Sequence, residues 1–169
     1  MRIVVWLTEG TWEACIDGAR DQPAAASIEL LHVIDAESLD ALAAAQASLL
    51  GRGVAANSGP LADNLRAAQQ ALLDAGQARL GRPARRQARW GRPEREVVDS
   101  CASAGMLILA RDGDHTRLGP RSIGHKTRFI VDHAPCRVLL VWPDEPPDLS
   151  TLPPPPPRGT SHPSPPPAP

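Results

Sequence analysis

Residues 124–141, GHKTRFIVDHAPCRVLLV, join a helical pattern to a short apolar segment. The first part predicts a helix from about Ile123 to His133, because helices commonly end shortly before a proline and Pro135 follows. The segment from Arg137 to Trp142 is short and apolar, as expected of a buried strand. This part of the chain is therefore predicted to be one helix followed by one strand.

The same alternation of strand and helix extends back to the N-terminus. Four more segments predict strands, the last of them polar and suited to a sheet edge: Ile3–Leu7, Ile28–Ile34, Met106–Ala110 and Arg86–Trp90. The sequence predicts helices between them: one from Gly10 or Thr11 to Gln22, one from Leu39 to Leu50, one over Leu61–Leu80 and one from Pro93 to about Gly105. Strands that alternate with helices predict an α/β fold with helices on both faces of a parallel sheet.

Apolar spacing predicts which helix faces are buried. The predicted core residues are Cys15, Ile16 and Ala19 in the first helix, Leu61, Leu65, Ala68 and Leu72 in the helix ending at Leu80, and Val97, Val98 and Cys101 after Pro93. In a parallel α/β sheet, ligands bind beyond the carboxyl ends of the strands. We therefore expect a binding site beside three segments: Thr8–Glu9, Val33–Ala36 and Ala110–Asp114.

Composition excludes several classes of protein. The 169 residues suit one ordinary domain, and 18 basic against 19 acidic side chains leave no overall basic field for nucleic acid. The sequence contains no apolar run long enough for a membrane helix and no signal-like start. Cys15, Cys101 and Cys136 lie far apart, so we interpret them as reduced packing residues in a cytoplasmic protein.

Proline is distributed very unevenly. Thirteen of the nineteen prolines lie within residues 143–169. We therefore predict a globular domain over residues 1–142 and a Pro-rich disordered tail over 143–169, with polyproline II at Pro153–Pro157. The tail could be a PxxP ligand or a spacer, but an extension without a specific partner is the interpretation we favour.

Three stretches resemble the universal stress protein family: LLHVID at Leu30–Asp35, Gly91–Pro93, and the block from Gly124 to Val141 with its HAPC ending at His133–Cys136. The resemblance covers Met1 to about Trp142. It implies a three-layer sandwich around a five-stranded parallel sheet of order 3-2-1-4-5, which is adenine nucleotide alpha hydrolase-like and Rossmann-like. It also implies a homodimer paired through the last strand.

Many members of that family bind ATP or another adenine nucleotide through the motif Gly-x2-Gly-x9-Gly-Ser/Thr, whose glycines let backbone amides approach the phosphates. Counting back from Gly124 places Arg111 and Asp114 at the first two glycines, and His125 replaces the hydroxyl residue. Asp114 would bring a carboxylate toward a phosphate, and Arg111 would add bulk where close approach is needed. Gly113 is one residue away, so a small loop shift would restore that glycine.

Other residues favour an anion site at the start of the last helix. Basic residues are concentrated there: Arg111, His115, Arg117, Arg121, His125, Lys126 and Arg128. Glu9-Gly10-Thr11 resembles the family's Asp-Gly-Ser, whose Asp helps to hold the nucleotide, and Val33 matches the residue whose backbone meets the adenine. The resemblance thus implies a nucleotide site that includes Glu9, Val33, Gly124, His125, Lys126 and Thr127.

Several of these residues also have a purely structural interpretation. A carboxylate at Glu9 favours the start of a helix, and His125 suits a solvated first turn. His32 lies in an apolar strand and is predicted to be a hydrogen-bonded core histidine, while His133 is predicted to interact with the negative end of its helix. The histidines and cysteines lack metal-ligand spacing, and no cysteine has a positioned base, so we expect no metal and no catalytic residue.

These observations predict a regulatory module, not an enzyme, that binds an adenine nucleotide (ATP, ADP or AMP) at the carboxyl ends of the first and fourth strands. The degraded motif leaves open a ligand-free stress protein that acts through its dimer surface. A slow nucleotide hydrolase using Asp112 or Asp114 with His115 is a further alternative. A nucleic-acid partner would rest on the arginines from Arg79 to Arg95, which cross several elements and which we interpret as solvated surface.

Overall fold

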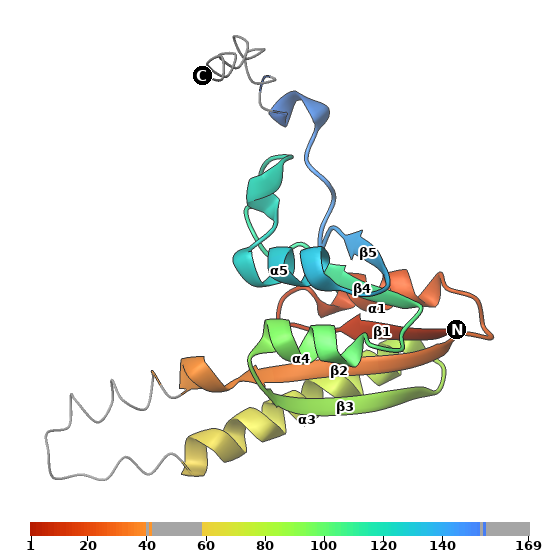
Figure 1. The fold of residues 1–169 in the computed structure, drawn as a ribbon, viewed down its shortest axis with the longest axis vertical. Helices are drawn as coiled ribbons and strands as arrows, with labels where there is room; N and C mark the ends of the chain where they lie inside the picture. Colours follow the sequence, from red (N-terminus) through yellow and green to blue (C-terminus); the bar gives the residue numbers. More distant parts are fainter. Residues whose placement is uncertain (40, 42–58, 153, 155–169) are drawn as a thin grey trace, which may run out of the picture.

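The computed structural model describes residues 1–39, 41, 59–152 and 154, and its elements form one sheet with helices around it (Figure 1). The strands are β1 (Arg2–Trp6), β2 (Ser27–Asp35), β3 (Ala84–Gly91), β4 (Met106–Ala110) and β5 (Arg137–Val141). The helices are α1 (Trp12–Arg20), α3 (Gly59–Leu80), α4 (Pro93–Ser100) and α5 (His125–His133), with short 3-10 helices η1 (Pro120–Ser122) and η2 (Leu149–Thr151). All strand pairs are parallel and the order is β3-β2-β1-β4-β5, which confirms the predicted fold class.

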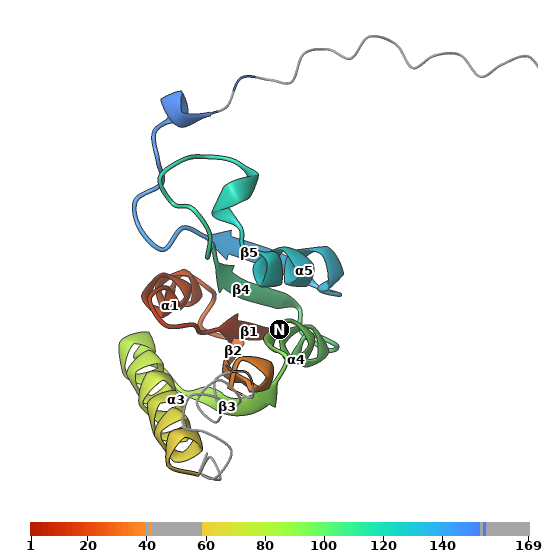
Figure 2. The same cartoon turned by 90° about the vertical axis from the view of Figure 1, so that its left-hand side faces the viewer.

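Figure 2 shows α1 and α3 on one face of the sheet and α4 and α5 on the other, and an apolar cluster lies on each face. Alternate residues of β1 point to opposite faces: Ile3 and Val5 pack with α1 and α3, whereas Val4 and Trp6 pack with α4 and α5. Both faces of β1 are therefore covered by helices, which explains why this strand is continuously apolar. β3 lies at an edge of the sheet, as its polar alternation predicted.

The predicted buried face of α3 is wrong by about one position along the helix. Its buried residues are Gln69, Leu73, Gly76 and Leu80, whereas Leu72 is only half-buried. A side chain at Gly76 would place its Cβ 2.9 Å from the Leu7 Cδ1 atom, so glycine lets the helix approach β1 closely. The N-terminal turns of α3 extend past the sheet, and their leucines serve a different surface, described below (Figure 1).

The predicted core positions of α1 and α4 agree closely with the structure. Cys15, Ile16 and Ala19 of α1 are buried, as are Val97 and Cys101, while Val98 is half-buried. Residues 36–39 are helical. The remainder of the helix predicted from Leu39 to Leu50, and the polyproline II predicted at Pro153–Pro157, fall largely outside the described residues.

Burial makes two thiols unreactive. It raises the pKa of Cys15 and of Cys101 to about 12, so both are protonated at neutral pH. All three cysteines are free. This environment fits the packing role that the sequence predicted.

The arginines from Arg79 to Arg95 are distributed over several elements and largely neutralised. Four of them pair with carboxylates that come from other parts of the fold: Arg79 with Asp17, Arg86 with Asp74, Arg89 with Glu96 and Arg92 with Glu37. Arg82 donates to the carbonyl oxygens of Ala19 and Pro23. The sequence interpretation was a solvated surface, and the structure adds that four of these arginines are ion-paired.

Residues after Trp142 still contact the domain. The Leu118 backbone N–H donates to the Thr151 hydroxyl oxygen at 3.0 Å, so η2 touches the loop between β4 and α5. In the part of the chain that the structure describes, no helix has the length and apolarity needed to cross a membrane.

Candidate functional site

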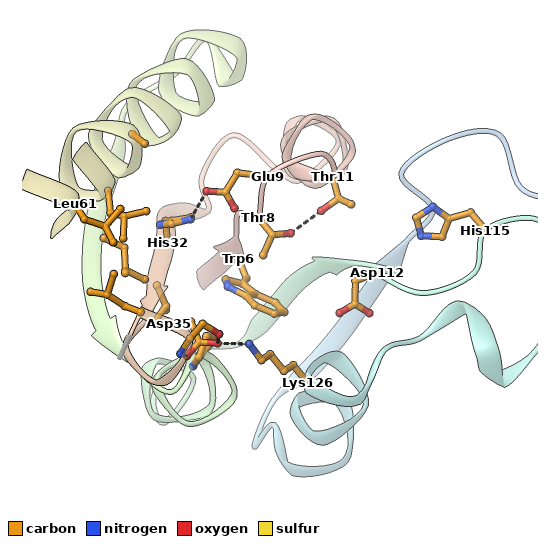
Figure 3. A pocket seen from close by; sticks show the side chains of 17 residues that line it. Trp6, Thr8, Glu9, Thr11, His32, Asp35, Leu61, Asp112, His115 and Lys126 are labelled. Carbon is orange, nitrogen blue, oxygen red and sulfur yellow. Dashed lines mark hydrogen bonds and ion pairs between the residues drawn. The ribbon is translucent and has the colours of Figure 1, made fainter. Parts of the chain in front are cut away.

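A cavity of about 540 Å³ lies at the carboxyl ends of the central strands (Figure 3). Trp6 at the end of β1 contributes an indole whose Nε1–H has no acceptor among the described residues. One wall is apolar and comes from β2, residue 39, α3 and α4: Val33, Ile34, Leu39, Leu61, Leu65, Ala68 and Pro93. The polar side comes from the turn after β1, the end of β2, the loop after β4 and α5: Thr8, Glu9, Thr11, His32, Asp35, Ser38, Asp112, His115 and Lys126.

The first group of polar contacts is centred on His32. Its Nε2 atom lies 3.3 Å from Glu9 Oε1, and its Nδ1 atom lies 3.2 Å from the Gln69 amide nitrogen. Gln69 Nε2 also donates to the carbonyl oxygens of His32 and Arg89, at 3.1 and 3.0 Å. The Glu9 carboxylate can only accept, so a ring proton on Nε2 suits this contact, and it leaves Nδ1 as an acceptor beside the Gln69 amide nitrogen, which is itself a donor group.

The charge state of His32 follows from its surroundings. Burial lowers its pKa below the ordinary value of 6.5, and this effect outweighs the Glu9 carboxylate, which acts in the opposite direction. His32 is therefore neutral at pH 7 and holds Glu9 by donating a hydrogen bond. It is the hydrogen-bonded histidine that the sequence predicted, and it also lines the cavity.

The second group of polar contacts joins β2 to α5. Lys126 Nζ donates to Asp35 Oδ2 at 2.5 Å, and Asp35 Oδ1 accepts from the backbone N–H groups of Glu37 and Ser38. Burial opposes ionisation of Asp35, but the hydrogen bonds from Lys126 and Ser38 and the lysine charge outweigh it and lower the pKa to about 2. Asp35 is therefore a carboxylate over the whole physiological range, and the ammonium of Lys126 is already paired.

The third polar feature is Asp112, which occupies the start of α5. Its Oδ1 atom accepts from the Gly124 backbone N–H at 2.7 Å. A Cβ on Gly124 would lie 2.9 Å from both carboxylate oxygens, so glycine is needed for this close approach. The N-terminus of a helix attracts negative charge, and here the protein supplies that charge itself.

The loop before α5 corrects the expectation for Asp114 and Arg111. Asp114 accepts from Thr116 within its own turn, and the Arg111 guanidinium contacts Ser122 and lies 4.4 Å from the centre of the Trp142 ring. Neither residue lines the cavity. The physical reason is the path of the loop, which turns both side chains toward local partners.

Gly113 does not restore the expected phosphate cradle. Its backbone N–H donates to the Ser122 carbonyl oxygen at 3.1 Å, and Asp114 N donates to Arg121 O at 2.9 Å. A Cβ on Gly113 would lie 2.2 Å from Arg121 O. This glycine therefore lets two backbone segments of the loop pair, and its amide is already used.

The residues predicted for a nucleotide site fall into three groups. Glu9, Val33 and Lys126 line the cavity, and Gly124 stands beside it through its bond to Asp112. His125 is exposed and Thr127 is fully buried, and neither lines the cavity.

The predicted concentration of basic residues divides in a similar way. Of the seven residues named for it, only His115 and Lys126 belong to the cavity lining. Arg117 pairs with Asp114, and Arg128 donates to the Pro120 carbonyl oxygen. The expected basic field at the phosphate position is therefore not assembled inside this cavity.

Sequence reasoning missed Trp6, the leucines of α3 and the part played by Asp35 and Asp112 in the cavity. Asp35 is the last residue of β2 and Asp112 lies two residues after β4, both at the strand ends where the strand-end rule placed a binding site. The sequence thus indicated that these two residues lie near the site, but it did not indicate that their side chains line the cavity. The α3 leucines gave no separate signal, because an apolar wall and a core face have the same periodicity.

Solved structures share this architecture. A universal stress protein in complex with cAMP matches with a TM-score of 0.56 at 15% identity, over 85% of this chain and 98% of the other. The universal stress protein UspA from Lactobacillus plantarum matches at 0.53 and 16%, over 83% and 97%. This chain has the universal stress protein fold.

A third universal stress protein-like match is the hypothetical protein MJ0577, with a TM-score of 0.58 and 18% identity over 83% of this chain and 94% of the other. No family model matches the chain. No curated protein matches it either. The family resemblance of the sequence is thus confirmed at the level of the fold.

Proposed function

We propose that this chain is a universal-stress-type regulatory module that binds an adenine nucleoside or nucleotide in the cavity described above and does not turn it over. The observation that carries the proposal is a cavity of ligand size, apolar on one side and polar on the other, at the carboxyl ends of the central strands. A structure of the same fold in complex with cAMP supports the choice of an adenine compound.

The end of β2 supplies a recognition edge for a base. β1 ends at Trp6, opposite Leu31, and the Leu31 carbonyl accepts from Leu7 N on the β1 side. Backbone groups alternate sides along a strand. Val33, two residues on, therefore points its N–H and C=O to the space beyond β1, where they are available to the edge of a heteroaromatic ring.

The apolar wall suits the face of the same ring. Leu61 and Leu65 of α3 line the cavity, and Figure 3 shows Leu61 beside α3 and Glu9 on the turn after β1. Burying a flat ring against such a wall is favourable in proportion to the apolar area removed from water. Glu9 would accept hydrogen bonds from ribose hydroxyl groups.

The groups available for nucleotide hydrolysis already have structural partners, which favours a binding role. Asp112 accepts from Gly124 N, Asp114 points away from the cavity, and the His115 ring contacts the Arg111 carbonyl oxygen at 3.0 Å. An ATPase needs a group that positions water beside the terminal phosphate. If Asp114→Ala or His115→Ala lowered a measured rate of ATP turnover, the enzymatic alternative would replace this proposal.

The binding test uses two neighbouring alanines of α3. Both alanines are exposed, but Ala68 lines the cavity and Ala67 does not. Titration calorimetry with adenosine, AMP and ATP should detect binding to the parent protein. We expect Ala68→Phe to weaken that binding about tenfold or more by filling the cavity, and Ala67→Phe to leave it unchanged. Equal effects of the two substitutions, or no heat with any compound at millimolar concentration, would contradict the proposal.

The proposal includes a homodimer, in the cytoplasm, paired through β5. This strand ends the sheet, and its residues Val138 to Val141 are only half-buried. An unpaired strand edge is a template for another copy of the same chain. Sedimentation equilibrium should give twice the monomer mass, and a monomer at all accessible concentrations would remove this part of the proposal.

A further inference from the structure

The cavity carries an unusual balance of charge for a phosphate ligand. Among the described residues that line it, Glu9, Asp35 and Asp112 contribute three carboxylates, Lys126 contributes the one ammonium, and His32 and His115 contribute two imidazole rings. That ammonium is paired with Asp35 and leaves no free positive charge of its own. His32, neutral at pH 7, adds none.

The Asp112 carboxylate lies at the N-terminus of α5, where the helix dipole favours negative charge. Gly124 is the N-cap residue of α5, and its backbone N–H is already bonded to the Asp112 carboxylate. The carboxylate packs against Gly124 so closely that a Cβ there would lie 2.9 Å from either oxygen. A phosphate at this helix terminus would have to displace the carboxylate, which is exposed, or lie beside it, and like charges a few ångströms apart repel each other.

The loop that carries Asp112 is held in this arrangement. Gly113 and Asp114 donate to the backbone of Ser122 and Arg121, and the Arg111 side chain is fixed between Ser122 and Trp142. These contacts bracket Asp112 on both sides in the sequence. The carboxylate is thus a built part of the site and not a side chain that swings freely into it.

We propose that the cavity selects an uncharged adenine nucleoside over its phosphorylated forms, because the Asp112 carboxylate takes the position of a phosphate at the start of α5. The inference rests on the proposed function, since it specifies the ligand of the same cavity. The base would lie against the α3 leucines, and the sugar hydroxyl groups would donate to the carboxylates that a phosphate avoids.

The test compares affinities for adenosine, AMP and ATP by calorimetry, each with and without Mg²⁺. The parent protein should bind adenosine about tenfold or more tightly than AMP or ATP. Asp112→Asn keeps an oxygen that can accept from Gly124 N but removes the charge, so it should narrow this ratio and strengthen AMP binding. Asp114→Asn is the matched control: it removes the same charge two residues away, outside the cavity lining, and should leave the ratio unchanged.

The outcomes distinguish the proposed selectivity for a nucleoside from the proposed binding of an adenine compound. If AMP or ATP binds the parent as tightly as adenosine, or if Mg²⁺ makes ATP the tightest ligand, the selectivity is overturned while adenine binding stands. Equal ratios in Asp112→Asn and Asp114→Asn would also overturn the role of Asp112. If none of the three compounds binds the parent or either variant, the proposed function fails and the selectivity fails with it.

Discussion

At the scale of single residues, His32 shows how a polar group is retained in an apolar strand. It is 5% exposed, and both ring nitrogens have partners, Gln69 on one side and Glu9 on the other. Protonation would place a proton on Nδ1 against the Gln69 amide donor and would charge a buried ring. The site therefore holds the histidine neutral and uses its single proton to orient Glu9.

The lowered pKa of His32 predicts a pH dependence of stability. The unfolded state binds this proton near pH 6.5, whereas the folded state binds it only at lower pH. The free energy of unfolding is therefore unaffected by protonation of His32 above about pH 6.5 and decreases as the pH falls below that value. Urea unfolding at pH 7.0 and 5.5 should show a smaller unfolding free energy at pH 5.5. His32→Gln should flatten that dependence, and His133→Gln, at an exposed helix end, should retain it. An unchanged slope in His32→Gln would show that other groups control it.

The ion pair between Asp35 and Lys126 makes a second prediction. Lys126→Met leaves the partly buried Asp35 carboxylate without its cation, so the free energy of unfolding should fall by about 1 kcal/mol or more. Asp35→Asn combined with Lys126→Met should cost less than the sum of the two single substitutions. Additive single effects in urea unfolding would mean that the pair contributes nothing to stability.

At the scale of elements, α3 performs two functions along its length. Its C-terminal part packs Leu73, Gly76 and Leu80 into the core beside α1, and its N-terminal part places Leu61 and Leu65 on the cavity wall. The sequence predicted one core face made of Leu61, Leu65, Ala68 and Leu72. The structure divides them because the helix is longer than the strands beneath it, so its first turns extend beyond the sheet (Figure 1).

The neighbouring leucines of α3 test this division. Leu73 is 1% exposed and belongs to the core, whereas Leu72 is half-buried. Leu73→Ala should lower the free energy of unfolding by about 2–5 kcal/mol through lost burial and a residual cavity. Leu72→Ala should cost about 1 kcal/mol, within the range of partly exposed substitutions. Equal losses, or a larger loss for Leu72→Ala in chemical denaturation, would restore the face predicted from the sequence.

The boundaries of the other elements show what local signals can determine. Strand β4 matches its prediction residue for residue, and the ends of β1, β2 and β5 differ by one residue. Pro93 begins α4 as expected of a proline in the first turn, and α5 begins at His125, two residues after the predicted start. Short apolar runs bounded by turn residues carry enough information for this, because each must cross the interior once.

At the scale of the whole molecule, the predicted division at Trp142 makes a claim about stability. The domain should fold without the Pro-rich tail, since the two packed faces of the sheet lie within residues 1–142. Removing residues 153–169 should change the free energy of unfolding by less than about 0.5 kcal/mol.

Removing residues 143–169 also deletes the bond between Leu118 and Thr151 and should cost about 1 kcal/mol. Thermal and urea unfolding of the two truncations beside the full chain will measure both values. A cooperative transition that disappears after removal of 153–169 would contradict the predicted boundary.

The amino-acid sequence by itself was sufficient for the class of fold, the sheet edge at β3 and the end of the sheet where the cavity lies. Each depends on a pattern of near neighbours: apolar runs, prolines and glycines at element ends, and the order of strands and helices. The resemblance to universal stress proteins added the strand order, which the structure confirms.

Only the tertiary structure decided which side chains meet in the cavity. Asp112 and Asp114 are two residues apart, yet backbone pairing between Gly113 and Ser122 sends one carboxylate to the start of α5 and the other into its own turn. Lys126 meets Asp35 across 91 positions of sequence. The direction of a loop side chain is set by contacts between segments distant along the chain, and no local pattern encodes those contacts.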